Sequence, residues 1–148
     1  MAALFFSIGF VTWLNGPLIT FVQVAFNLSD VASFLVPVCF YLAYFVFPLP
    51  ATLLSKQIGL RHGLVVSLAI MAVGTGLFGE CVNARWYAGA LSGLTVIGAG
   101  LSLLQITINP YVSFLGDHDR AAQRIAIMGV ANKFAGIVAP ALFAIIVI

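Results

Sequence analysis

The fold is decided by residues 124–148, which read RIAIMGVANKFAGIVAPALFAIIVI. This run is apolar, long enough to cross a membrane as a helix, and contains one lysine, Lys133, beside Asn132. Because a helix rises about 1.5 Å per residue, Lys133 lies roughly 14 Å into the run, near the middle of a hydrocarbon core about 30 Å thick. A charge there costs at least about 2.5 kcal/mol, so it rarely faces lipid. Gly129 and Gly136 lie one turn away on either side, which predicts the wall of a cavity.

The composition of the 148-residue chain is that of a membrane protein. Hydrophobic residues make up 63% and charged residues 7%, whereas soluble domains carry about 25% charged residues. Six Lys and Arg residues against four acidic residues form no basic patch, which excludes nucleic-acid partners. The cysteines, Cys39 and Cys81, are interpreted as small packing residues, with a disulfide or a metal pair as the alternative.

Five apolar segments of spanning length follow one another along the chain. They cover about 3–26, 31–54, 63–78, 86–115 and 123–148. Their short connections favour antiparallel neighbours, so the expected fold class is all-α, a polytopic membrane helical bundle with about five transmembrane helices. Ser29 or Asp30 is expected to cap the second helix. The odd number of spans, and an end within an apolar run, indicate a fragment cut near the outer end of its fifth helix.

The charges of the loops predict the orientation of the chain. The loops after the second and fourth segments hold four positive residues, which are Lys56, Arg61, Arg120 and Arg124. The loops on the other side hold only Arg85, with Asp30 and Glu80. We therefore expect the N-terminus and the positive loops in the cytoplasm.

Three of the segments carry polar side chains along one helical face. The first has Thr12, Asn15 and Gln23, the fourth has Ser102, Gln105 and Asn109, and the fifth has Asn132 and Lys133. Amides and hydroxyls donate and accept hydrogen bonds, which suits a polyhydroxylated ligand such as a sugar, with Trp13 as an aromatic surface. The alternative for any single Asn or Gln is a hydrogen bond that joins two helices. Gly89, Gly93 and Gly100 share one face of the fourth segment and predict close helix packing.

Lys133 is expected to be functional, because an ionisable residue at mid-membrane depth usually is. A structural ion pair and snorkelling are the alternatives. The five segments hold no acidic residue to pair with it, so its partner is expected to be Gln105, Asn15, a backbone carbonyl, a substrate or the missing half of the protein. It is either a fixed cation or a group that gains and loses a proton.

The sequence contains no catalytic motif of the kinds HExxH, GxSxG, P-loop or CxxC. His62 and His118 fall in expected loops and are interpreted as solvated. We therefore expect no enzyme activity, no catalytic residue, no metal site and no cofactor.

Two motifs resemble a known family of sugar transporters. Residues 9–19, GFVTWLNGPLI, are similar to helix one of the fucose/glucose–galactose permease family of the major facilitator superfamily. Residues 103–111, LLQITINPY, resemble its helix-four motif LLQxxxNPY. Residues 49–63 resemble the superfamily's loop between helices two and three, and the similarity continues through Ala139-Pro140.

The resemblance implies a twelve-helix fold of two six-helix bundles, in which this chain supplies helices one to five. It also implies secondary transport of a monosaccharide, coupled to a cation gradient. The fucose branch carries an aspartate in helix one and a glutamate in helix four, where this chain has Gly16 and Gln105. Asn132 matches an asparagine of the fucose branch, whereas Lys133 replaces a small residue. The combination of WLNG at residues 13–16 with NK at residues 132–133 looks more like the glucose, galactose or N-acetylglucosamine branch.

The expected function is therefore a proton- or sodium-coupled symporter of glucose, galactose or N-acetylglucosamine rather than fucose, in the cell inner membrane. The expected substrate-binding residues are Asn15, Gln105, Asn109, Asn132 and Lys133, together with groups from a missing C-terminal bundle. The alternative is an inactive truncated remnant or a structural or assembly protein that does not transport.

Overall fold

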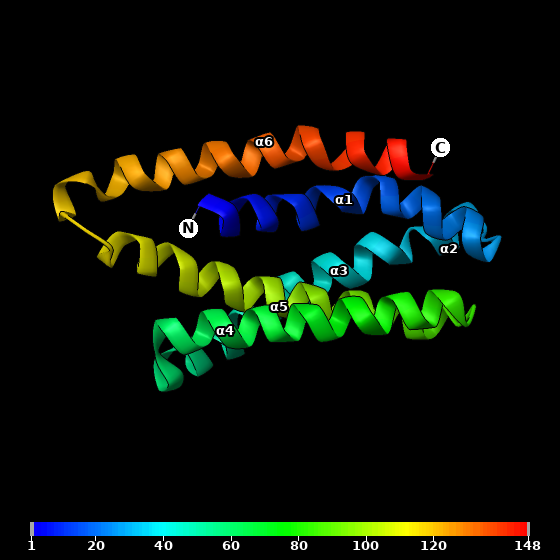
Figure 1. The fold of residues 1–148 in the computed structure, drawn as a ribbon. Helices are drawn as coiled ribbons and strands as arrows, with labels where there is room; N and C mark the ends of the chain where they lie inside the picture. Colours follow the sequence, from blue (N-terminus) through cyan, green and yellow to red (C-terminus); the bar gives the residue numbers. More distant parts are fainter. Residues whose placement is uncertain (1, 148) are drawn as a thin grey trace. The chain divides into compact units, whose positions relative to one another are not determined.

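The computed structural model describes residues 2–147, apart from the side chains of Asn15, His118 and Val147. Within this range the chain is helical and forms no strand, which confirms the expected all-α fold class. The elements are α1 (Ala2–Phe26), α2 (Asp30–Ser33), α3 (Leu35–Val46), α4 (Pro48–Asn83), α5 (Tyr87–Phe114), the short 3₁₀ helix η1 (His118–Arg120) and α6 (Ala121–Val147). Figure 1 shows them in chain order.

The chain divides into two compact units, and each is described by itself. Unit 1 comprises Met1–Phe21 and Val112–Ile148, and unit 2 comprises Val22–Tyr111. Unit 1 therefore holds most of α1, the end of α5 and all of α6. Unit 2 holds α2, α3, α4 and most of α5.

Three helices within the described residues, α4, α5 and α6, are long and apolar enough to cross a membrane. α1 is a fourth if its two parts, Ala2–Leu14 and Gly16–Phe26, form one span bent by 46°. Five spans were expected. The difference lies in the second predicted segment, which is divided between a shorter apolar stretch, Asp30–Val46, and the beginning of α4.

The helical run α4 is broken at Gly59, which has φ +80° and ψ 163°. Glycine adopts a positive φ at no steric cost because it lacks a Cβ atom. The predicted segment 31–54 ends before this break, and the predicted segment 63–78 begins after it. Gly59 therefore separates two helical stretches, and the positive residues Lys56 and Arg61 flank the break.

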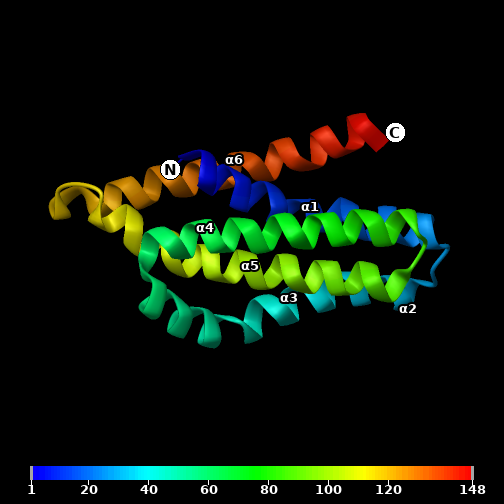
Figure 2. The ribbon, with the colours of Figure 1, turned by 60° about the horizontal axis from the view of Figure 1, so that its bottom comes forward.

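In unit 2, α4 and α5 pack closely through glycines, and Figures 1 and 2 show the two helices side by side. A Cβ atom added at Gly93 would lie 2.7 Å from the backbone nitrogen of Phe78, and one at Gly100 would lie 2.7 Å from the Met71 side chain. A Cβ atom at Gly89 would meet Cys81 of α4. The packing role predicted for Gly89, Gly93 and Gly100 is therefore confirmed.

α3 also packs against α5 within unit 2. A Cβ atom at Gly98 would lie 2.7 Å from the carbonyl oxygen of Phe40 and 3.1 Å from the Cβ atom of Ala43. The Tyr87 hydroxyl donates a hydrogen bond to the carbonyl of Ala32. The Ser29 hydroxyl accepts from the Ala32 amide at 3.4 Å, which confirms that Ser29 caps α2.

In unit 1, the first part of α1 lies along α6, as Figures 1 and 2 both show. A Cβ atom at Gly9 would meet Asn132 and would lie 3.0 Å from the Cβ atom of Ala135, which is fully buried. Aromatic rings extend this contact, because the centroids of Phe6 and Phe134 are 6.4 Å apart. The absence of a side chain at Gly9 therefore brings the amide of Asn132 against α1.

The Arg124 side chain holds the end of α5 in unit 1. Its guanidinium donates hydrogen bonds to the carbonyls of Asp117 at 3.0 Å, Ser113 at 3.2 Å and Val112 at 3.4 Å. The last carbonyls of a helix have no partner within the helix. One side chain at the beginning of α6 therefore satisfies several of these groups.

Candidate functional site

Lys133 lies at the middle of α6, and its ammonium group faces an aromatic ring of α1. The Lys133 Nζ atom is 5.7 Å from the centroid of the Trp13 ring, which is a cation–π geometry. Gly136 makes room for this ring, since a Cβ atom there would lie 3.0 Å from Cε2 and Nε1 of Trp13. The ammonium group of Lys133 and the indole ring of Trp13 therefore lie next to each other within unit 1.

Asn132 precedes Lys133 and is half-buried. Its side-chain oxygen lies against Gly9, where a Cβ atom would collide with it. Unit 1 therefore places a neutral amide and an ammonium group at successive positions on α6, both beside the first part of α1.

Gln105 lies in α5 and is held by a tyrosine that the sequence analysis did not single out. The Tyr44 hydroxyl, from α3, donates a hydrogen bond to Oε1 of Gln105. Both side chains are half-buried. This contact belongs to unit 2, whereas Asn132 and Lys133 belong to unit 1.

The remaining predicted site residues are Asn109 and Asn15. Asn109 is exposed on α5, directly before Pro110. The Asn15 side chain lies outside the described residues, and its position in α1 falls between the two bent parts of that helix.

Other members of the predicted polar faces have local partners. The Gln23 amide donates to the carboxylate of Asp30 at 2.7 Å, and the Thr12 hydroxyl donates to the Ile8 carbonyl at 2.8 Å. The Ser102 hydroxyl is buried and has no hydrogen-bond partner within the part of the chain that the structure describes. The polar stripe of the first segment is therefore used in part for local structure.

Two contacts of the candidate site residues were missed by sequence reasoning. Trp13 lies beside Lys133, but sequence reasoning considered this ring only as a surface for a sugar and not as a neighbour of the lysine. Tyr44 lies in the apolar run LVPVCFYLAYFV and is one of its two tyrosines. A phenol in such a run signals a hydrogen bond, because a buried tyrosine hydroxyl usually finds a partner.

The charged groups of the chain do not form a metal site within the described residues. No group of three or more His, Cys, Asp or Glu side chains gathers there, and Cys39 and Cys81 are both free. The acidic residues Asp30, Glu80, Asp117 and Asp119 lie at helix ends or in connections.

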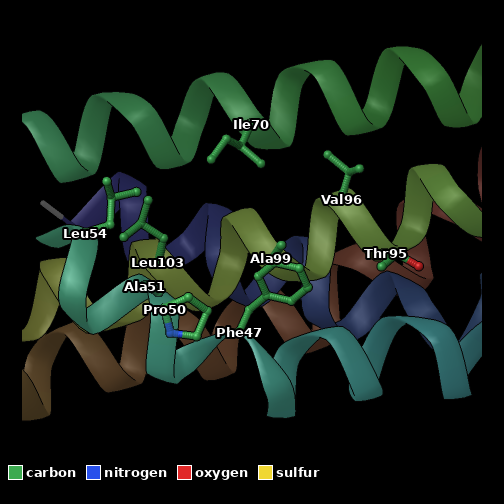
Figure 3. A pocket seen from close by; sticks show the side chains of 9 residues that line it. All are labelled: Phe47, Pro50, Ala51, Leu54, Ile70, Thr95, Val96, Ala99 and Leu103. Carbon is green, nitrogen blue, oxygen red and sulfur yellow. The ribbon is translucent and has the colours of Figure 1, made fainter.

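A cavity of about 350 Å³ lies in unit 2, between parts of α4 and α5. Figure 3 shows its lining side chains, which are Phe47, Pro50, Ala51, Leu54, Ile70, Thr95, Val96, Ala99 and Leu103. The one hydroxyl among them, on Thr95, donates to the carbonyl of Leu91 at 2.9 Å. The cavity includes none of the predicted site residues, and its apolar lining does not suit a sugar.

Comparison with known proteins shows which family this chain belongs to. The family model described as Major Facilitator Superfamily matches residues 1–148. The chain is 38% identical over 148 residues to the glucose/galactose transporter of Brucella abortus biovar 1 (strain 9-941), covering 100% of this chain and 36% of that protein. It is 32% identical over 139 residues to the L-fucose-proton symporter of Escherichia coli (strain K12), covering 94% of this chain and 32% of that protein.

A solved structure is also similar. The crystal structure of the major facilitator transporter FucP in the outward conformation matches with a TM-score of 0.73 and 30% sequence identity. The match covers 96% of this chain and 35% of that one, so the chain spans about a third of the length of these relatives. The resemblance to the fucose/glucose–galactose permeases is thereby confirmed, and the chain belongs to the major facilitator superfamily.

Proposed function

We propose that this chain forms part of a secondary active transporter, not an enzyme, that carries a monosaccharide together with a cation. The observation that carries the proposal is the pair of polar groups held within apolar helices, the Gln105 amide bound by Tyr44 and the Lys133 ammonium over Trp13. The names of the two relatives, a glucose/galactose transporter and an L-fucose-proton symporter, support a sugar as the substrate.

The proposed sugar contacts are neutral amides and one cation, which are Asn15, Gln105, Asn109, Asn132 and Lys133. An amide donates and accepts hydrogen bonds at once, whereas an ammonium only donates. Such a set matches the lone pairs and hydroxyl protons of an uncharged sugar. The Trp13 ring, 45% exposed, supplies an apolar face next to Lys133.

The proposed substrates are glucose, galactose or N-acetylglucosamine, in preference to fucose. The resemblance to the fucose branch implies that Gly16 and Gln105 occupy the positions where that branch carries its two carboxylates. A proton carrier of that kind is therefore missing from these two positions, and the coupling cation is a proton or a sodium ion bound by other groups.

The proposed setting is a longer protein in the cell inner membrane, with a second, C-terminal bundle opposite this one. The sugar would bind near mid-membrane depth between the bundles, and rocking of the two halves would give alternating access. The charge of the loops supports a cytoplasmic N-terminus.

The test is uptake of labelled hexoses by the full-length protein in liposomes, with proton and sodium gradients imposed separately. We expect saturable uptake of glucose, galactose or N-acetylglucosamine, with accumulation driven by one of the two gradients. Uptake of no hexose by well-folded full-length protein would instead fit the non-transporting alternative, which the named relatives do not favour.

A further inference from the structure

The contact between Tyr44 and Gln105 fixes which end of an amide a ligand can meet. The Gln105 side chain has a carbonyl oxygen that accepts hydrogen bonds and an NH₂ group that donates two. The Tyr44 hydroxyl donates to the oxygen, Oε1. The Tyr44 hydroxyl therefore uses one lone pair of the amide oxygen and fixes which way the amide is turned, so that its NH₂ group points away from this contact.

The packing of α3 on α5 sets this geometry. Gly98 has no side chain, so α3 can approach α5 closely at this point. A Cβ atom added at Gly98 would lie 2.7 Å from the carbonyl oxygen of Phe40 and 3.1 Å from the Cβ atom of Ala43. Tyr44 follows Ala43 directly, and Gln105 lies about two helical turns after Gly98 on α5. Because Phe40 and Ala43 are buried in this contact, the phenol is carried on a fixed backbone rather than on a loop.

We propose that Tyr44 is a positioning residue, which orients Gln105 so that its NH₂ group donates to an acceptor oxygen of the sugar. This inference rests on the proposed function. It adds a direction to the hydrogen bond between Gln105 and the sugar, since the ligand atom that meets the NH₂ group must be an acceptor, such as a ring oxygen or a hydroxyl lone pair. Without Tyr44 the amide is free to turn by 180° and to present its oxygen instead.

The first test compares Tyr44→Phe with Tyr41→Phe in the full-length protein in liposomes. Both changes remove one phenol hydroxyl from α3, and Tyr41 is exposed with no side-chain hydrogen bond inside the described part of the chain. We expect Tyr44→Phe to raise the half-saturation concentration for the transported hexose about 5- to 30-fold, and Tyr41→Phe to change it less than about twofold. In a Gln105→Ala background, Tyr44→Phe should add less than about twofold, because it acts through Gln105.

A hydrogen bond that only joins two helices makes a different prediction. It lowers the melting temperature of Tyr44→Phe while the half-saturation concentration stays at the wild-type value, and that result would overturn the proposal. Gln105→Met provides a second route if Tyr44→Phe fails to fold, because methionine keeps the length of the side chain but has no N–H group. Wild-type affinity in Gln105→Met would also overturn it. A wild-type protein that carries no hexose would refute the proposed function itself, and an unchanged Tyr44→Phe in a working transporter would refute only the role of Tyr44.

Discussion

The ammonium nitrogen of Lys133 lies 5.7 Å from the centroid of the Trp13 ring, so the charged group of α6 is paired with an aromatic ring of α1. An aromatic face attracts a cation by about 0.5 to 2 kcal/mol without neutralising it. The N–H groups of the ammonium stay available as hydrogen-bond donors, whereas a carboxylate partner would compete for them. Within unit 1 this pairing accounts for a lysine in an apolar helix without an acidic neighbour.

The close packing of α4 against α5 predicts that alanine substitutions at two nearby glycines of α4 affect stability differently. A Cβ atom at Gly74 would lie 2.8 Å from the backbone nitrogen of Ile97, whereas a Cβ atom at Gly76 would meet nothing within 4 Å among the described residues. We expect Gly74→Ala to destabilise the full-length protein by about 1 to 3 kcal/mol, because a close-packed backbone must move. Gly76→Ala should leave the melting temperature in detergent unchanged or slightly raised, since alanine favours the helix. Equal melting temperatures for the two variants would contradict the packing shown here.

The hydrogen bonds of Arg124 predict that it matters for stability more than its neighbour Arg120. Arg124 donates to three carbonyls near the end of α5, while the Arg120 side chain is exposed. Arg124→Ala and the matched control Arg120→Ala each remove one positive charge, from the beginning of α6 and from the adjacent η1. We expect Arg124→Ala to cost about 1 to 3 kcal/mol and to lower the melting temperature, because the carbonyls lose a charged donor.

Lysine in place of Arg124 gives a finer test of the same contact. An ammonium group cannot reproduce the planar fork of a guanidinium, so Arg124→Lys should recover only part of the lost stability. Arg120→Ala should melt like the wild-type protein. Full recovery by lysine would mean that the charge, and not the set of three hydrogen bonds, holds the end of α5.

The elements of the fold that depend on local pattern were predictable from the sequence. Runs of apolar residues predicted the helices, a serine before α2 predicted its cap, and the spacing of Gly89, Gly93 and Gly100 predicted a packing face. Each of these features is set within a few turns of one helix. The connection between the predicted segments 31–54 and 63–78 contains the break, but the sequence alone did not identify Gly59 as the residue with a positive φ.

The partners of the site residues could not be predicted, because they come from distant parts of the chain. A helical periodicity places Gln105 on a face of α5, but it does not say that Tyr44 of α3 meets it. In the same way, the position of Lys133 indicates a need for a partner without naming Trp13. Gln23 was assigned to a polar face that would meet a ligand, but its amide instead donates a hydrogen bond to Asp30 at the beginning of α2.

The asymmetry of loop charges predicts which end of α4 faces the cytoplasm. Lys56 lies before the break at Gly59 and Glu80 lies near the end of α4, and both side chains are exposed. The stretch from Leu60 to Asn83 would be about 36 Å long at 1.5 Å per residue, enough to separate the two positions by a membrane. In intact cells, a membrane-impermeant thiol reagent should label Glu80→Cys and not Lys56→Cys, in a background without the native cysteines. Labelling of position 56 from outside would reverse the orientation.

Lys133 and Trp13 predict a set of matched transport variants in the full-length protein. If Lys133 is a fixed cation that binds the sugar, Lys133→Gln should raise the half-saturation concentration about 2- to 30-fold, which corresponds to about 0.5 to 2 kcal/mol of lost hydrogen bonding to the sugar. Lys133→Arg keeps the charge and the contact with the ring, so it should retain part of the transport with an unchanged pH dependence. Trp13→Leu should resemble Lys133→Gln, and the double variant should be little worse than either single one, because both remove the same contact.

The two other roles of Lys133 give different patterns in the same experiment. If the lysine gains and loses a proton during each cycle, Lys133→Arg and Lys133→Gln should both lose gradient-driven accumulation while they keep downhill exchange, because arginine does not titrate in this range. If it only pairs structurally with the second bundle, both variants should fail to accumulate in the membrane. The proposed fixed cation is favoured because Trp13 holds the ammonium group in place and adds no group that titrates. Wild-type sugar affinity in a well-expressed Lys133→Gln protein would remove Lys133 from the binding site altogether.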